Sequence, residues 1–220
     1  MDTLEYLLSP IIWVMEAVLI IFHTLTGSIG LSILLLSFTF ALIALPLQKK
    51  GQRIEKEINE KISVIDHELK PFKASLKGEE LFLATENIYE KHHYHPIKSI
   101  ASGTSFLVML PILISAIFLF SNNPLLAHKE FLFIDNLAEP DGTFNFINVL
   151  PFIMLSITLI DSKLRYKSNK QAQRRFMLIA FVLLVLVYNM PSALVLYWTG
   201  SNFFSLVSNN LRKNKPLFQS

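Results

Sequence analysis

The sequence of 220 residues contains no cysteine. This absence excludes disulfide bonds, thiolate metal sites, a cysteine nucleophile and a lipid-modified amino-terminal cysteine. The chain also lacks a glycine-rich phosphate loop, a His-Glu-x-x-His motif and a serine in a nucleophile elbow. We therefore expect a protein that is not an enzyme and that holds no cofactor or metal ion.

Charged residues are missing from several long stretches. Nineteen of the 20 Lys and Arg residues lie in three blocks, residues 49–98, 163–175 and 212–215, and apolar runs separate these blocks. Cationic loops stay on the cytoplasmic side of a membrane, so the alternation predicts an all-α membrane protein with five spans, an external amino terminus and a cytoplasmic carboxyl terminus. The expected spans are residues 30–47, 101–120, 145–160, 176–188 and 192–211.

Residues 121–144 form the expected external loop. Its Lys129 is the one cation outside the three blocks, and acidic residues surround it in the sequence. The formal net charge of +3 would suggest nucleic-acid binding in a soluble protein, but here the cations lie where the topology requires them. We therefore expect the lipid bilayer, and no nucleic acid, as a direct partner.

The first apolar stretch, residues 7–25, is long enough to span but carries Pro10, Glu16 and His23. A carboxylate in the middle of the bilayer costs about 2.5–3.5 kcal/mol. We therefore expect residues 1–28 to form an amphipathic helix in the outer interface, with Trp13 at the depth of the headgroups. The alternative is a sixth span, which would place the amino terminus in the cytoplasm.

Residues 48–98 are expected to form a cytoplasmic helical hairpin. An apolar stripe at helical spacing predicts its first helix, and Pro71 and Gly78 bracket the expected break. The stripe consists of Ile54, Ile58, Ile62, Ile65 and Leu69. Lys56, Glu60 and Lys61 lie on the outer face, where they could contact a ribosome, a targeting receptor or an emerging chain. The alternative is that the apolar stripe only packs the two helices of the hairpin together and that the hairpin contacts no partner.

Histidines 92, 93 and 95 cannot all face one ion on a regular helix, so we do not assign them to a metal site. No ionisable residue lies inside any of the five spans, which argues against an ion-coupled transporter. The spans instead contain hydroxyl and amide side chains. Such residues either join helices or line a polar groove, and both interpretations remain open.

Several motifs together resemble the YidC/Oxa/Alb family of membrane protein insertases. The run Gly-Leu-Ser-Ile at 30–33 leading to Leu-Pro-Leu at 45–47 is similar to the first core span of that family, and Met-Leu-Pro-Ile at 109–112 is similar to the second. The segment Phe-Leu-Phe-Ile-Asp-Asn-Leu at 131–137 is similar to the external loop. The most specific match is Pro-Ser-Ala-Leu-Val-Leu-Tyr-Trp at 191–198 with Ser-Asn at 201–202. The resemblance covers nearly the whole chain, with residues 29–220 as the five-span core.

The resemblance implies an insertase of the bacterial plasma membrane that acts on nascent membrane proteins, with a Sec-type channel as a further candidate partner. It implies a hydrophilic groove, open to the cytoplasm, that accepts the polar flank of a substrate. The groove residues expected from it are Ser37, Ala41, Ser105, Trp198, Ser201 and Asn202. The family usually carries an arginine at the position of Ala41, so this chain lacks the expected groove cation. That departure leaves a second hypothesis open, a specialised paralogue that assists assembly of one membrane complex.

Overall fold

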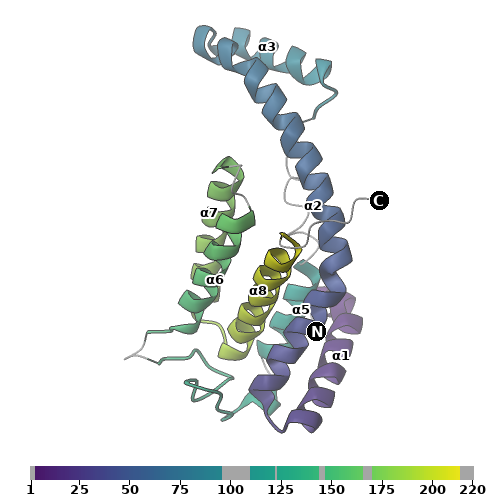
Figure 1. Cartoon of the computed structure of the whole chain (residues 1–220), viewed down its shortest axis with the longest axis vertical. Helices are drawn as coiled ribbons and strands as arrows, with labels where there is room; N and C mark the ends of the chain where they lie inside the picture. The colour runs from purple at the N-terminus through teal and green to yellow at the C-terminus, as the bar shows by residue number, and fades with distance from the viewer. Residues whose placement is uncertain (1–2, 96–109, 122, 144–146, 166–169, 214–220) are drawn as a thin grey trace. The chain divides into compact units, whose positions relative to one another are not determined.

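The computed structural model describes residues 3–95, 110–121, 123–143, 147–165 and 170–213 (Figure 1). The chain forms two compact units, Met1–Ile43 with Ile112–Ser220, and Ala44–Pro111. Within the described ranges the regular structure is helical, and β pairing is limited to isolated bridges such as that between Phe131 and Ile134. This confirms the expected all-α class.

The first unit is a bundle of apolar helices. It contains α1 (Thr3–Thr26), the beginning of α2 (Ile29–Ser75), most of α5 (Leu110–Ser121), α6 (Leu150–Arg165), α7 (Lys170–Val187) and α8 (Ser192–Lys213), with a short 3-10 helix, η2 (Pro124–Leu126). Of the described helices, α1 and α2 are both long and apolar enough to cross a membrane, and residues 110–121 and 176–187 form shorter apolar helices. Helices suit a bilayer because every backbone hydrogen bond is made within the element.

Helices α6 and α7 each extend at one end beyond the apolar run that predicted them, whereas α6 begins at Leu150 and not at the expected residue 145. The polar continuation of α6 reaches Arg165, and α7 begins at Lys170. At 1.5 Å per residue, their 16 and 18 residues reach about 24 and 27 Å. Both lengths are still below the hydrocarbon thickness of about 30 Å.

The segment between α5 and α6 packs on the ends of the helices. The ring of Phe131 lies against Gly30, where a side chain of any size would collide with it. The backbone N–H groups of Ser192 and Ala193 donate to the carbonyl oxygens of Glu139 and Leu137 at 2.8 and 3.0 Å. These bonds satisfy donors of the first turn of α8, which have no partner within the helix.

Asp141 performs the same role for α6. Its carboxylate oxygens accept from the N–H groups of Val149 at 2.8 Å and Leu150 at 2.7 Å, and the side chain is almost fully buried. A negative charge at a helix amino terminus also interacts favourably with the helix dipole. The start of α6 is therefore fixed by the loop that precedes it.

One face of α1 packs along the bundle. Met15 and Leu19 are fully buried in the same core cluster as Ile33 and Leu36 of α2. A tight turn joins α1 to α2, and Gly27 adopts φ +68°, a conformation that favours glycine.

Residues 7–25 contain eleven Leu, Ile, Val and Phe residues. On insertion scales these eleven residues together contribute about −3 to −7 kcal/mol to the free energy of membrane insertion, whereas one carboxylate costs about 3 kcal/mol.

The second unit contains the continuation of α2 and helix α3 (Gly78–Lys91). Helix α2 runs through Pro71 to Ser75, so the break occurs at residues 76–77, inside the bracket expected from the sequence. Ile65 and Leu69 of the predicted stripe are buried with Ile88 of α3, whereas the earlier members are only partly covered. The small apolar cluster holds the two helices together.

Polar contacts also join these helices. Glu68 of α2 accepts from the Nζ of Lys91 at 3.0 Å and lies 3.0 Å from the Nε2 of His92. The hydrogen bond from Lys91 holds the pKa of the Glu68 carboxyl below its usual value. His92 is thus placed beside a carboxylate from another helix, which sequence proximity alone did not indicate, whereas His93 and His95 are exposed.

Candidate functional site

The predicted site residues of the first unit gather around α8. Ser37 of α2 is fully buried, and its hydroxyl donates to the Leu34 carbonyl at 2.7 Å. A Cβ atom placed on Gly200 of α8 would collide with the Ser37 hydroxyl and would lie 3.1 Å from Leu34. Helices α2 and α8 therefore approach closely at this level, because Gly200 has no side chain.

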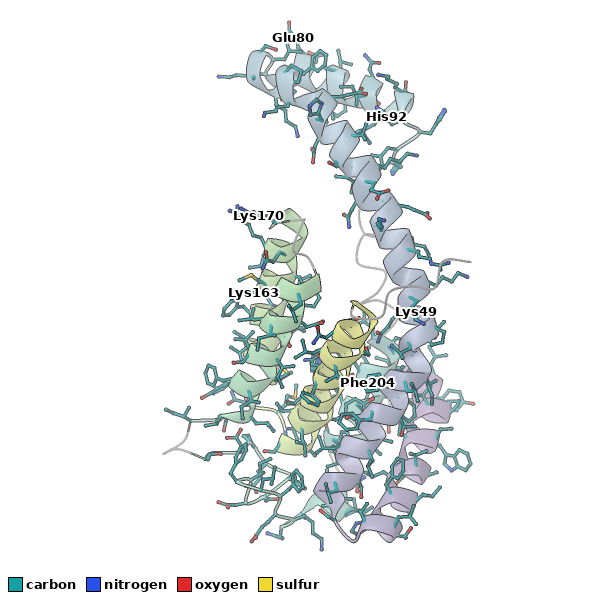
Figure 2. All side chains as sticks on the ribbon, in the orientation of Figure 1. Lys49, Glu80, His92, Lys163, Lys170 and Phe204 are labelled. Atoms are coloured by element: carbon teal, nitrogen blue, oxygen red, sulfur yellow. The ribbon has the colours of Figure 1, made fainter. Side chains whose placement is uncertain are left out.

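An aromatic pair extends this contact. The rings of Phe38 on α2 and Phe204 on α8 lie 6.1 Å apart, within the range of favourable ring interactions. Phe204 is labelled in Figure 2 on the last half of α8. Ala41, one turn after Phe38, is 4% exposed. A small buried side chain thus occupies the position at which the resemblance leads one to expect an arginine.

On its other side α8 is hydrogen-bonded to α6. The amide nitrogen of Asn202 donates to the Thr158 hydroxyl at 2.9 Å, and that of Asn209 donates to the Asp161 carboxylate at 3.0 Å. Asn209 also lies 3.3 Å from the hydroxyl of Ser205. We call Thr158, Asp161, Asn202, Ser205 and Asn209 the α6–α8 polar ladder. Each hydrogen bond offsets part of the cost of placing these polar groups away from water.

The beginning of α8 contacts α5. The rings of Phe120 and Tyr197 lie 5.8 Å apart, and residues 192–197 are all buried. Helix α8 therefore contacts α2, α5 and α6, and its exposed and polar positions are concentrated after Tyr197.

The structure places the predicted groove residues in two groups. Ser37 and Ala41 are buried against neighbouring side chains, whereas Trp198, Ser201 and Asn202 are partly exposed. Ser105 lies outside the described residues. Asn202 was expected in the groove, and its side-chain amide donates to Thr158 of α6. The structure thus assigns it a contact that the sequence did not indicate.

Two contributors were not identified from the sequence. Gly200 was not singled out, although a lone glycine within an apolar span often marks a close helix approach. Thr158 was also missed, although it lies one turn before Asp161 on the same face of a span. These two polar residues on one face were the available signal.

In the second unit the predicted hairpin surface is exposed. Lys56 and Glu60 lie 3.7 Å apart with about three quarters and two thirds of their side chains exposed. An exposed pair of this kind contributes little to stability. Lys61 is exposed as well. These three side chains are accessible on their own helix, as a contact surface would require.

The sequence profile of the family described as "60Kd inner membrane protein" matches residues 21–216. The chain belongs to this family, the YidC/Oxa1 family of membrane protein insertases. Membrane protein insertase MisCB of Bacillus subtilis is 28% identical over 220 residues, covering 93% of this chain and 78% of the relative.

Other bacterial insertases share a similar percentage of identical residues with this chain. Membrane protein insertase YidC of Fusobacterium nucleatum is 27% identical over 184 residues, covering 82% of this chain and 84% of the relative. YidC of Herminiimonas arsenicoxydans is 28% identical and covers 92% of this chain, which spans only 36% of that longer relative. These relatives support insertase function in general, and none of the three is named for a catalysed reaction.

The Gly200 contact yields a prediction. Gly200→Ala should destabilise the α2–α8 contact by about 1–3 kcal/mol, because the new methyl group overpacks the interface. The thermal unfolding temperature of the purified protein in detergent should fall. Ser201→Ala, at the next residue, should change it little.

The double variant Ser37→Ala, Gly200→Ala should recover part of the loss, because it removes the hydroxyl that the methyl group meets and leaves the 3.1 Å approach to Leu34. A normal unfolding temperature for Gly200→Ala alone would show that the two helices are not in the described contact.

Proposed function

We propose that this chain inserts small membrane proteins by accepting the polar flank of a nascent segment along α8 and releasing the apolar segment to lipid. The observation that carries the proposal is the change of character along α8. The helix is fully buried up to Tyr197 and then presents the partly exposed Trp198, Ser201 and Asn202 within an apolar bundle. Such polar positions are costly in lipid unless they serve packing or a substrate.

The proposed mechanism needs no catalyst. Hydroxyl and amide groups along α8 replace part of the hydration of the substrate flank, which lowers the cost of moving it through the bilayer. The transfer of the apolar segment into lipid, at about 25 cal/mol per Å² of apolar surface, then drives the step. Ser105 is proposed to contribute a hydroxyl to the same path.

The short helices support this mechanism. Helices α6 and α7 are shorter than the usual hydrocarbon thickness even with their polar ends included. A bilayer thins around helices that are too short for it. A thinner bilayer shortens the apolar distance that a polar flank must cross.

We further propose the bacterial plasma membrane as the location, with the carboxyl terminus and the hairpin in the cytoplasm. The cationic blocks alternate with the apolar helices along the sequence, so that all three blocks can lie on the cytoplasmic side, which supports this orientation. Lys56, Glu60 and Lys61 are then available to a ribosome, a targeting receptor or a Sec-type channel.

A second candidate function follows from Ala41. The absence of a groove cation at this buried position favours a specialised paralogue that assists assembly of one membrane complex. Such a protein would not need to attract the acidic flanks of many substrates.

Site-specific photocrosslinking tests the substrate path. A photoreactive residue at Trp198 or Ser201 should crosslink to stalled nascent chains of a short single-span protein. The same residue at Val185, which is 76% exposed on α7, should not. Equal crosslinking at all three positions would indicate contact through lipid and would contradict a path along α8.

The missing cation gives a separate prediction. Ala41→Arg should increase the insertion of substrates with acidic flanks at least several-fold relative to neutral flanks, because the charge attracts the flank in a low-dielectric setting. Ala41→Met is the matched control, since it adds a long side chain without charge. If both variants change acidic and neutral substrates in the same proportion, Ala41 does not determine flank preference.

A further inference from the structure

Helix α1 has an outward face with no protein partner in the described residues. Most of its exposed side chains are large and apolar, and Thr3, Pro10, Glu16 and Thr24 are exposed as well. The large apolar ones are Leu4, Tyr6, Leu7, Trp13, Val14, Ile20, Ile21 and Leu25. The surface therefore requires an apolar environment, and the bundle alone does not supply it.

The opposite face packs lengthwise on the bundle. Leu8, Met15 and Leu19 are buried, and Ile11 and Val18 pack against the same core. From Ile11 to Leu19 this contact covers eight steps, or about 12 Å of helix, and Leu8 is buried one turn earlier. A helix lying flat on the membrane surface would touch upright neighbours only over a short part of its length. Figure 1 shows α1 running beside α2 within this unit.

The charges of α1 do not fit an interfacial helix. Helices that lie in the headgroup region carry a polar face rich in Lys and Arg. The first cation of this chain is Lys49, so α1 has none. Its 24 residues reach about 36 Å, which is enough to cross the hydrocarbon. Glu16 is the one carboxylate near its centre, and the eleven Leu, Ile, Val and Phe residues counted above outweigh its cost.

We propose that α1 is a sixth membrane span whose outward face contacts lipid hydrocarbon, so that its amino-terminal end lies on the cytoplasmic side. Helix α1 is joined to α2 by a tight turn and runs antiparallel to it. The side of the membrane on which α1 begins is inferred from the cytoplasmic placement of the hairpin proposed above. The depth of α1 in the bilayer is inferred independently of that placement. This proposal takes the alternative of a sixth span, in place of the expected helix in the outer interface with Trp13 at the headgroups.

Trp13 reports the depth directly. The chain contains two tryptophans, and Trp198→Phe leaves Trp13 as the single fluorophore. The variant is reconstituted into vesicles whose phospholipids carry bromine either near the chain ends or near the headgroup. We expect quenching at least two-fold stronger by bromine near the chain ends, since Trp13 is close to the middle of α1. Stronger quenching by bromine near the headgroup would overturn the proposal.

Cysteine labelling tests the side of the membrane. Because the chain has no cysteine, single variants carry one unambiguous label site. Thr3→Cys should resist an impermeant maleimide in intact cells and react after permeabilisation, as Ser75→Cys in the hairpin should. Leu132→Cys is the control for the external side. Reaction of Thr3→Cys in intact cells, or no reaction after permeabilisation, would overturn the proposal.

The readouts separate this inference from the proposed function. Both report location alone, so an inactive protein with a buried Trp13 would refute insertion and leave the sixth span intact. An active protein with Trp13 at the headgroups would refute the sixth span and leave the proposed insertion function intact.

Discussion

Polar groups removed from water are costly without partners inside the protein, and this constraint governs how α8 and the beginning of α6 are held. Helix α8 is where the demand is greatest, since it carries the amides and hydroxyls that follow its apolar beginning. Thr158 and Asp161 on α6 accept hydrogen bonds from Asn202 and Asn209. The α2 side is instead close-packed, because Gly200 leaves room for Ser37. One helix is thus held by hydrogen bonds on one side and by shape on the other.

The loop between α5 and α6 extends the same principle to the helix ends. Asp141 accepts from the first N–H groups of α6, and the carbonyls of Leu137 and Glu139 accept from those of α8. These contacts set where both helices begin. Residues of this one loop thus hold the beginnings of two helices.

The sequence was sufficient for the features that depend on composition. Apolar runs and cation blocks predicted the helical class, and the family motifs predicted the membership that the profile at 21–216 establishes. Features that depend on pairing between distant positions were not predictable. The Ser37–Gly200 contact, the partner of Asn202 and the lengthwise packing of α1 each require knowing which helices are neighbours. A helical period shows which residues share a face, but not what that face meets.

The central claim is that this family member inserts nascent membrane proteins. Expression in a bacterium depleted of its own insertase tests it most directly, with insertion of a small single-span protein as the readout. The account predicts that the chain restores insertion and growth. If the chain is folded and present in the membrane but restores neither, the claim of general insertase activity is contradicted and the specialised assembly partner is favoured.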